Sequence, residues 1–420
     1  KGGWQVVSSG GVASNTVVSD GGVEYVDVGG VDTGTTVSEG GRIIVASGGL
    51  SVSATMQYAG GQLILGGGAA SAATLSGGAQ VVYANGLASG TAIYSLGYQY
   101  VSGGTASTTT LYQYGEEYVF AGGAAVGTVV SSAGVQYVSS GGTASGTVIS
   151  ASGTELVCLG GTASATEVKS NGLLMISAGL TTGTVVSASG AERILAGGVA
   201  SGTFLLSGGQ QFVSFGGVVR GALVTSGGML TVSLGGIDSG SNLLAGAIEV
   251  VSGGTAIGTM IGSGAMLQAY AGASLSGVGI ASGGILYAGS GFSLSGTTLT
   301  TGEIVQIAAG ANALATNVGS STEAYVLSGG VASGTALTVN GRQVVSLGGL
   351  ASATTVRSGG ALIVGAGGSA LDTVVSSGAV VSATAGGFWS GTYVSSGGFE
   401  FVGSGNAVGT TVGAGGTEYV

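Results

Sequence analysis

The 420-residue chain contains 93 glycines, no proline and no histidine, and its charged residues make up only 6%, for a formal net charge of −10. Without an imidazole there can be no Ser-His dyad, no histidine acid or base and no imidazole-bound metal. The seven basic residues are scattered along the chain, which excludes a basic patch for nucleic acid or an anionic membrane surface. We expect no cofactor and no metal.

Apolar stretches are short throughout. A glycine or serine interrupts each of them after four or five residues, far below the roughly 18 residues of a membrane-spanning helix and about half the length of a membrane-barrel strand. We therefore expect no membrane insertion by this segment. No basic, apolar leader is present either, so we expect any export signal to lie outside this sequence.

One repeat of nearly constant length runs along the whole chain. The threonine that follows Ala-Ser-Gly, or its equivalent, recurs 21 times between Thr16 and Thr410, a mean step of about 18.8 residues. A fixed period of this size indicates stacked units, each unable to bury its apolar face alone. The sequence predicts an all-β fold, a single-stranded parallel β-helix (β-solenoid) of about 22 rungs of roughly 19 residues, in one continuous array over residues 1–420.

Each copy predicts short strands separated by glycine corners. The copy over residues 135–149 reads VQYVSSGGTASGTVI and contains two β-like segments, QYV and TVI. Runs of β-branched residues bounded by Gly-Gly and Ser are strand signals. Paired glycines such as 141–142 supply positive φ and close backbone approach at the turns. Proline is absent because every strand is expected to donate its N–H groups to neighbouring rungs.

Stacking the copies aligns their residues in columns. The first predicted core column consists of Val7, Val26, Val45, Leu65, Val82, Val101, Val119, Val138, Val157, Ile176, Ile194, Val213 and Val232. A second lies two residues after the aligned threonine, for example at Val130, Ile149 and Val168. Gln or Glu often precedes the first column by two residues, and strict alternation would bury it beside the valine. We expect a bend that moves this Gln/Glu column to an edge, as a ladder of amides.

The residue between the Gln/Glu column and the first core column varies among Tyr, Ile, Met, Phe and Arg193. An arginine at this place indicates an outward face, so tyrosines such as Tyr118 and Tyr137 are expected to form an exposed ladder. Between about 262 and 325 the paired glycines lapse while the spacing holds. We interpret this irregular stretch as drift within one solenoid rather than as a separate domain.

Paired carboxylates are the remaining candidates for catalysis, as in some polysaccharide-acting enzymes built on β-helices. The candidate pairs are Asp20 with Glu39, Asp27 with Glu24, Glu116 with Glu117, and Glu400 with Glu418. Each is more simply a solvated corner or a ladder position, and the chain has no long inserted loop that could carry an active site. The one cysteine, Cys158, occupies a position held by serine in neighbouring copies. We predict no catalytic residue and a chain that is not an enzyme.

The strings VQYVSSGGTASGTVIS, LSGGVASGTAL and VSSGGFEFVGSG resemble the passenger repeats of AIDA-type self-associating autotransporter adhesins, which include TibA-like and antigen-forty-three-like proteins. The resemblance covers essentially the whole chain. It implies a secreted, surface-displayed parallel β-helix of Gram-negative bacteria that promotes aggregation, biofilm formation and adhesion. Because the sequence opens and closes within a repeat, we expect an excerpt of a larger protein that also has a signal peptide and a translocator barrel.

The same resemblance implies modification of repeat serines by a heptosyltransferase. The candidate O-glycosylation sites are Ser131, Ser132, Ser139, Ser140, Ser145 and Ser150. Serine is also an ordinary small polar turn residue, so both interpretations of these positions remain open.

Three functions are compatible with the sequence. The first is a structural adhesin stalk, extracellular or displayed on the bacterial outer membrane, whose partners are copies of itself on other cells, surface glycans or matrix polysaccharide, and a heptosyltransferase. The second is a self-assembling extracellular filament or surface-layer protein, since bare terminal rungs would stack end to end. The third is a polysaccharide-acting β-helix enzyme. We favour the adhesin stalk.

Overall fold

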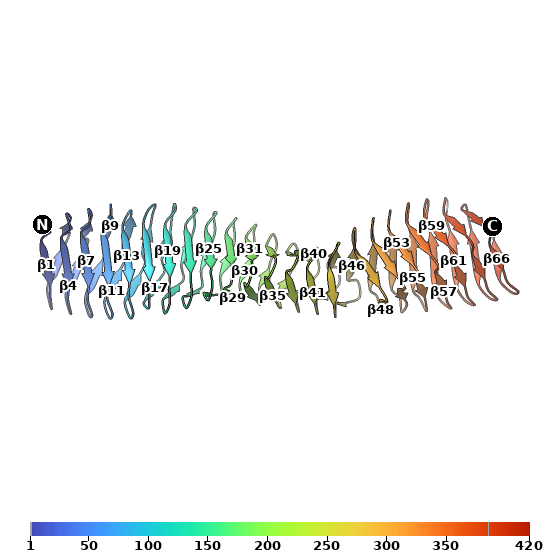
Figure 1. Cartoon of the computed structure of the whole chain (residues 1–420), viewed down its shortest axis with the longest axis horizontal. Coiled ribbons are helices and arrows are strands. Elements are labelled where there is room, and N and C mark those ends of the chain that lie inside the picture. The colour runs from blue at the N-terminus through green and yellow to red at the C-terminus, as the bar shows by residue number, and fades with distance from the viewer. Residues whose placement is uncertain (1, 385) are drawn as a thin grey trace. The chain divides into compact units, whose positions relative to one another are not determined.

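The computed structural model describes residues 2–384 and 386–420. Over these residues the chain forms strands, turns and bends, and no helix that could cross a membrane occurs among them. The chain divides into two compact units, Lys1–Leu223 and Val224–Val420. Within each unit, short parallel strands repeat in rungs (Figure 1). The predicted all-β parallel β-solenoid of about 22 rungs is confirmed; a single continuous array over 1–420 stays a prediction.

Each rung contains three strands. In the first unit one rung consists of β22 (Val135–Val138), β23 (Thr143–Ser145) and β24 (Val148–Ile149). In the second unit one rung consists of β52 (Glu323–Val326), β53 (Val331–Ser333) and β54 (Ala336–Leu337). We call the stacks of four-, three- and two-residue strands the first, second and third walls. The prediction of two segments per copy was incomplete, because it missed the second wall.

Rungs pair in register along each wall. Gln136 and Val138 of β22 lie opposite Glu155 and Val157 of β25 (Thr154–Val157), so equivalent residues of successive copies are direct neighbours. Parallel strands are about 4.8 Å apart in the hydrogen-bonding direction. Residues at one repeat position therefore form a continuous column, as the sequence predicts.

The core lies where the columns of the three walls meet. Val119 of the first wall and Ala125 of the second belong to one buried cluster, and Val130 of the third wall is also fully buried. Burial of each such aliphatic side chain contributes about 1.5–3 kcal/mol. Both predicted core columns are confirmed, with one error: the member of the first column in its rung is Ile64, which is fully buried, whereas Leu65 is half-buried beyond the strand.

The Gln/Glu column does not bend outward. In β22 the side chains of Gln136 and Val138 are both buried, while Val135 and Tyr137 are half-buried on the opposite face. The predicted edge position was wrong because the strand alternates regularly across all four residues. The interior accepts the polar side chains because they hydrogen-bond to each other, which is the amide ladder that the sequence predicts. The outward position of the intervening tyrosines is confirmed.

Paired glycines meet two separate requirements at the corner. Gly141 has φ of +73°, a conformation that side-chain-bearing residues rarely adopt. Gly142 has negative φ, but a Cβ atom there would lie 2.4 Å from the carbonyl oxygen of Val119 in the preceding rung. The second glycine thus allows close approach of the rungs, although alanine holds the same place before β44 (Ser274–Ser276) and β50 (Asn312–Leu314), which still pair in register with the preceding rung.

Residues 262–325, where the glycine pairs lapse, retain the three-strand order but not the complete ladder. In the first wall, β43 (Met266–Ala269) pairs in register with β46 (Ile285–Ala288). In the second wall the sheet ends at β44 (Ser274–Ser276) and a new sheet begins at β47 (Ser293–Ser295). The third wall is interrupted between β45 (Gly279–Ile280) and β48 (Thr298–Leu299). This interruption lies within the second unit, near β46 and β48 in Figure 1.

Phe292 accounts for the interruption. It directly precedes β47, the place that the second glycine of the pair holds in regular rungs, as Gly142 does before β23. Alanine fits at that place before β44 and β50, which stay paired with the preceding rung, whereas Phe292 carries a whole ring and is 7% exposed. Leu275 and Leu294 add bulk in the adjacent column, where Ala256 and Ala313 are the neighbours on either side. The two walls separate because these side chains need more room than one rung step provides.

Replacing Phe292 by glycine together with Leu294→Ala is expected to close the second and third walls. Ser293 and Thr298 would then gain backbone hydrogen bonds to the preceding rung, each contributing about 1 kcal/mol. Hydrogen exchange of the Ser293 and Thr298 amides should slow about fivefold or more, while the Ile285 amide, already bonded to Ala265 across the first wall, should not change. Unchanged exchange at Ser293 and Thr298 would show that Phe292 does not hold the walls apart.

Candidate functional surface

The six candidate serines occupy the corners of one rung region of the first unit. Ser139 and Ser140 follow β22, Ser145 ends β23, Ser150 follows β24, and Ser131 and Ser132 precede β22. Ser132, Ser140 and Ser145 are exposed, and the other three are half-buried. Ser131 donates its hydroxyl to the carbonyl oxygen of Leu111 at 3.1 Å.

The three exposed serine hydroxyls make no hydrogen bond within the described residues, so they can react or bind without breaking the fold. Ser132 also has φ of 49°, which turns the chain at the corner. Each corner recurs one rung later, but its hydroxyl does so only in part: Ser164 repeats Ser145, whereas Ala121 and Leu159 flank Ser140. Whether any of them carries sugar stays a prediction.

Aromatic rings form a stacked column on the outer side of the first wall. Tyr118 stacks on Tyr137 with centroids 4.7 Å apart and planes 5° from parallel, and its ring lies 5.1 Å from that of Tyr100 at a tilt of 32°. On the third-wall side, Tyr94 stacks on Tyr112 at 5.0 Å. Because the faces of successive rings cover each other, the column exposes ring edges and hydroxyls. It is therefore poorly suited to stack sugars on ring faces.

The hydroxyl of Tyr118 donates to Glu116 Oε2 at 2.6 Å, and this hydrogen bond, with burial, raises the pKa of Tyr118. The Tyr118 hydroxyl is thus an anchored donor rather than a free one. Glu116 takes part as an acceptor on the outer face, which is an ordinary surface role.

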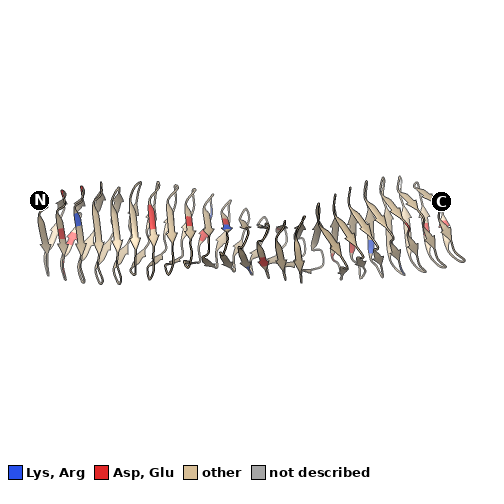
Figure 2. Ribbon diagram, viewed as in Figure 1, with Lys and Arg blue, Asp and Glu red and all other residues tan. Residues whose placement is uncertain are grey.

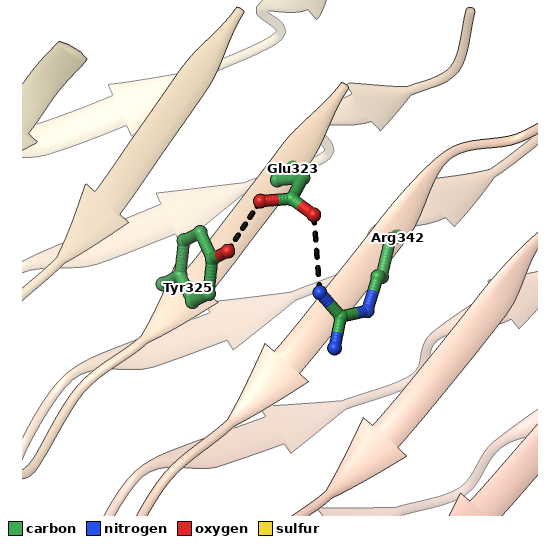
Figure 3. A network of polar contacts seen from close by, with 3 residues as sticks. All are labelled: Glu323, Tyr325 and Arg342. Carbon is green, nitrogen blue, oxygen red and sulfur yellow. Dashed lines mark hydrogen bonds and ion pairs between the residues drawn. The ribbon is translucent and has the colours of Figure 1, made fainter. Parts of the chain in front are cut away.

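Charged side chains are sparse over both units (Figure 2). One network combines Glu323 and Tyr325 of β52 with Arg342 of β55 (Arg342–Val345): Arg342 Nη1 donates to Glu323 Oε1 at 3.0 Å, and the Tyr325 hydroxyl donates to Glu323 Oε2 (Figure 3). The tyrosine hydrogen bond, with help from Arg342, lowers the pKa of Glu323. This partly exposed group ties two rungs together and offers no vacant acid or base.

The interior contains a polar ladder in which threonines join the Gln/Glu column, and the sequence predicted only the Gln/Glu part. Threonines of the aligned column, used above only to count repeats, are buried and donate to the Gln/Glu column: Thr128 to Glu117 at 2.9 Å and Thr147 to Gln136 at 3.0 Å. Gln136 Nε2 in turn donates to Glu117 Oε2 at 2.7 Å. The nearly constant spacing between Gln/Glu and Thr, 11 residues in most rungs and 10 between Gln99 and Thr109, was the signal that could have revealed the ladder.

Most of the candidate carboxylate pairs are not brought together. Glu116 points outward and Glu117 inward from the same strand. Glu24 is buried whereas Asp27, beyond the end of its strand, accepts a hydrogen bond from the Val28 amide.

Asp20 and Glu39 lie on exposed turns of successive rungs, each with φ of 50°. Glu400 and Glu418 are register partners across β64 (Phe399–Val402) and β67 (Thr417–Tyr419), but Glu400 is fully buried and cannot meet a polymer substrate.

Two further acidic pairs lie in the core. Asp32 and Asp238 replace the usual alanine of the second wall, and they face Glu24 and Glu249 respectively. Asp238 accepts a hydrogen bond from Thr259 at 2.8 Å, and Asp32 accepts one from Ser51 at 2.7 Å. Aspartate in an alanine column was the signal for these pairs. Their burial places them with the polar ladder, not with a catalytic site.

Burial shifts the titration of the ladder carboxyls. Loss of solvation raises the pKa of Glu155 to about 8 and that of Glu117 to about 7, and it also raises the pKa of Glu192. A carboxyl whose pKa is higher in the folded chain than in the unfolded chain stabilises the fold when protonated. That contribution is complete below about pH 4.5 and is lost as the pH rises through the folded value.

Comparison with known proteins identifies one family. Residues 112–172 match a family described as the adhesin of the bacterial autotransporter system, a probable stalk. The matched residues include all six candidate serines. The predicted resemblance to AIDA-type adhesin passengers is confirmed over this part of the chain. No curated protein matches the sequence.

Solved structures of several kinds of protein align with the chain. A fragment of TibA hyper-glycosylated by TibC is 25% identical over 98% of this chain and 94% of its own, with a TM-score of 0.19. The PL6 family alginate lyase AlyGC is 8% identical over 97% and 94%, with a TM-score of 0.23. The A-module of the Azotobacter vinelandii mannuronan C-5 epimerase AlgE4 is 11% identical over 91% and 88%, with a TM-score of 0.20. At these TM-scores none of the three likenesses informs the function.

Glu155→Gln is expected to remove part of the pH dependence of stability. A glutamine fits the ladder, because Gln99 already donates to Gln80 across one rung step, and it carries no charge to desolvate. The free energy of unfolding should be unchanged near pH 4.5 and higher than that of the unmodified chain by a few kcal/mol, in order of magnitude, above pH 8.

Chemical denaturation at pH 4.5, 7 and 9 measures this difference. Glu167→Gln is the matched control, because Glu167 is half exposed and pairs with Lys169 on the surface, where a pair is worth at most about 1 kcal/mol. Equal pH profiles for the Glu155→Gln variant and the unmodified chain would contradict a buried, mostly neutral Glu155.

Proposed function

We propose that this chain is the stalk of an autotransporter adhesin, displayed on the bacterial surface or secreted, which associates with copies of itself through its repeated outer surface. The match of residues 112–172 to an adhesin stalk family supports this proposal most directly. The outer surface fits the role, because the same three-strand rung recurs along each unit and the surface carries few charges. Many weak, identical contacts give strong attachment when two long arrays lie together.

The chain is proposed to be non-enzymatic. Its buried carboxylates are out of reach of a polymer, and two of the outward ones, Glu116 and Glu323, are held by Tyr118 and Arg342. Aggregation and biofilm formation would then follow from repetition of the surface, and surface glycans or matrix polysaccharide would be secondary partners.

Removal of whole rungs is expected to weaken aggregation in proportion to the length removed. Deleting residues 135–190 takes out three complete rungs and joins Gly134 to Ala191, the start of β31 (Ala191–Ile194), so that the columns stay in register. Particles coated with the shortened chain should aggregate more slowly than particles coated with the full chain at equal density, as measured by light scattering.

A matched control deletes nothing but replaces an exposed residue on a strand, as in Val374→Ala in β60 (Val374–Val375), and should aggregate normally. Full aggregation by a stub of two rungs would refute association through a repeated surface. Ordered fibres from the purified chain would instead favour the self-assembling filament.

We also propose that a heptosyltransferase modifies the corner serines. Protein made in its native host should then show a ladder of added sugar masses by intact mass spectrometry. Replacing Ser132, Ser140 and Ser145 by alanine should remove up to three sugars, whereas the same change at the half-buried Ser131, Ser139 and Ser150 should remove fewer. A bare mass for the unmodified chain would contradict this modification.

A further inference from the structure

The interrupted walls of the second unit leave backbone groups without partners on both sides of the gap. One rung after the gap, Asn312 and Asn317 donate their amides to the carbonyl oxygens of Phe292 and Thr297 at 3.1 and 2.8 Å. The equivalent amides of Ser293 and Thr298 form no such bond within the described residues. The edges of β47 and β48 that face the preceding rung therefore have no strand paired with them among those that the structure describes.

The facing edge is open too. One rung before the gap, the Gly258 amide donates to the carbonyl oxygen of Ser276 at 2.8 Å. The equivalent amide, that of Gly277, has no partner in the part of the chain that the structure describes. Unpaired donors and acceptors on two parallel edges constitute a template for one more strand.

A cavity of about 460 Å³ occupies the gap, within the size range of ligand sites in proteins. Its apolar lining includes Leu275, Leu286, Phe292 and Leu294, and its polar lining includes Ser274 and Thr297. No ionisable side chain lines the cavity. Leu275 and Ile280 are half-buried here, although their neighbours one rung earlier, Ala256 and Ile261, are fully buried. The apolar core is therefore partly accessible to solvent at this point.

We propose that the opening between β44–β45 and β47–β48 is a docking site for one extended peptide segment of a partner protein. The segment lies parallel to the flanking strands and donates and accepts backbone hydrogen bonds on both sides, as in β-strand addition. Its residues are small and uncharged, with an apolar side chain at each inward position to cover Leu275 and Leu294. This inference does not depend on the proposed function.

The unpaired backbone groups on both sides of the gap favour a peptide as the occupant. A sugar or a lipid could fill an apolar, uncharged cavity, but neither presents regularly spaced N–H and C=O groups at the strand repeat of about 3.3 Å per residue. The first wall is continuous across β43 and β46, which keeps the two open edges parallel. A bound peptide strand therefore adds to the second and third walls beside a first-wall ladder that is already paired.

The probe is a fluorescently labelled peptide GVASGTAL, the sequence of residues 330–337, which forms β53 and β54 in this chain. Titrated with the full chain, it should bind saturably with one site, as measured by fluorescence anisotropy. The control peptide carries Val331→Pro and Ala336→Pro, which remove the two amides that face the preceding rung in β53 and β54, and it should not bind.

The variant Phe292→Gly with Leu294→Ala, which closes the gap, should weaken binding at least about tenfold. A readout independent of this variant is hydrogen exchange in the unmodified chain: the peptide should slow exchange at Ser293 and Thr298 and leave Ile285 unchanged. Absence of saturable binding, equal binding of the proline peptide, or unchanged exchange at Ser293 and Thr298 would each overturn the proposal.

Discussion

The distance between successive rungs constrains every other feature of the two units. Parallel, in-register pairing fixes it at about 4.8 Å, so each residue must fit against its own equivalents above and below. Valine over valine and alanine over alanine meet this condition, as do tyrosine rings 4.7 Å apart. Where a residue exceeds its share of space, as Phe292 does, the walls separate. The fold is therefore specified one column at a time rather than by contacts between distant elements.

This constraint explains why the period and the core columns could be predicted from the sequence. A regular step and a branched aliphatic residue at a fixed place leave few alternatives to a parallel stack. The second wall was missed because its strands, such as Thr143–Ser145, consist of small residues without a β-branched run. They pair only because the neighbouring rung supplies the partner, which is tertiary information that a local pattern does not contain.

The Gln/Glu column was misplaced for a related reason. A lone buried carboxylate is costly, and the sequence alone does not show that Thr128 and Gln136 will both donate to Glu117. Once the three residues are known to meet, burial of the carboxylate is acceptable. The effect of Phe292 was equally hidden, because the lapse of glycine pairs was visible in the sequence but the tolerance of each corner for a side chain depends on the carbonyl of the rung below.

The buried acidic ladder also affects the electrostatic repulsion between neighbouring copies of the chain. Burial raises the pKa of Glu24, Glu117 and Glu400 to about 7 and that of Glu155 to about 8, so all four are mostly protonated in mildly acidic surroundings. The chain then carries less negative charge than the formal −10. Electrostatic repulsion between parallel copies is therefore weaker. Acidification moves the net charge of each molecule toward zero, where crowded protein surfaces associate more readily.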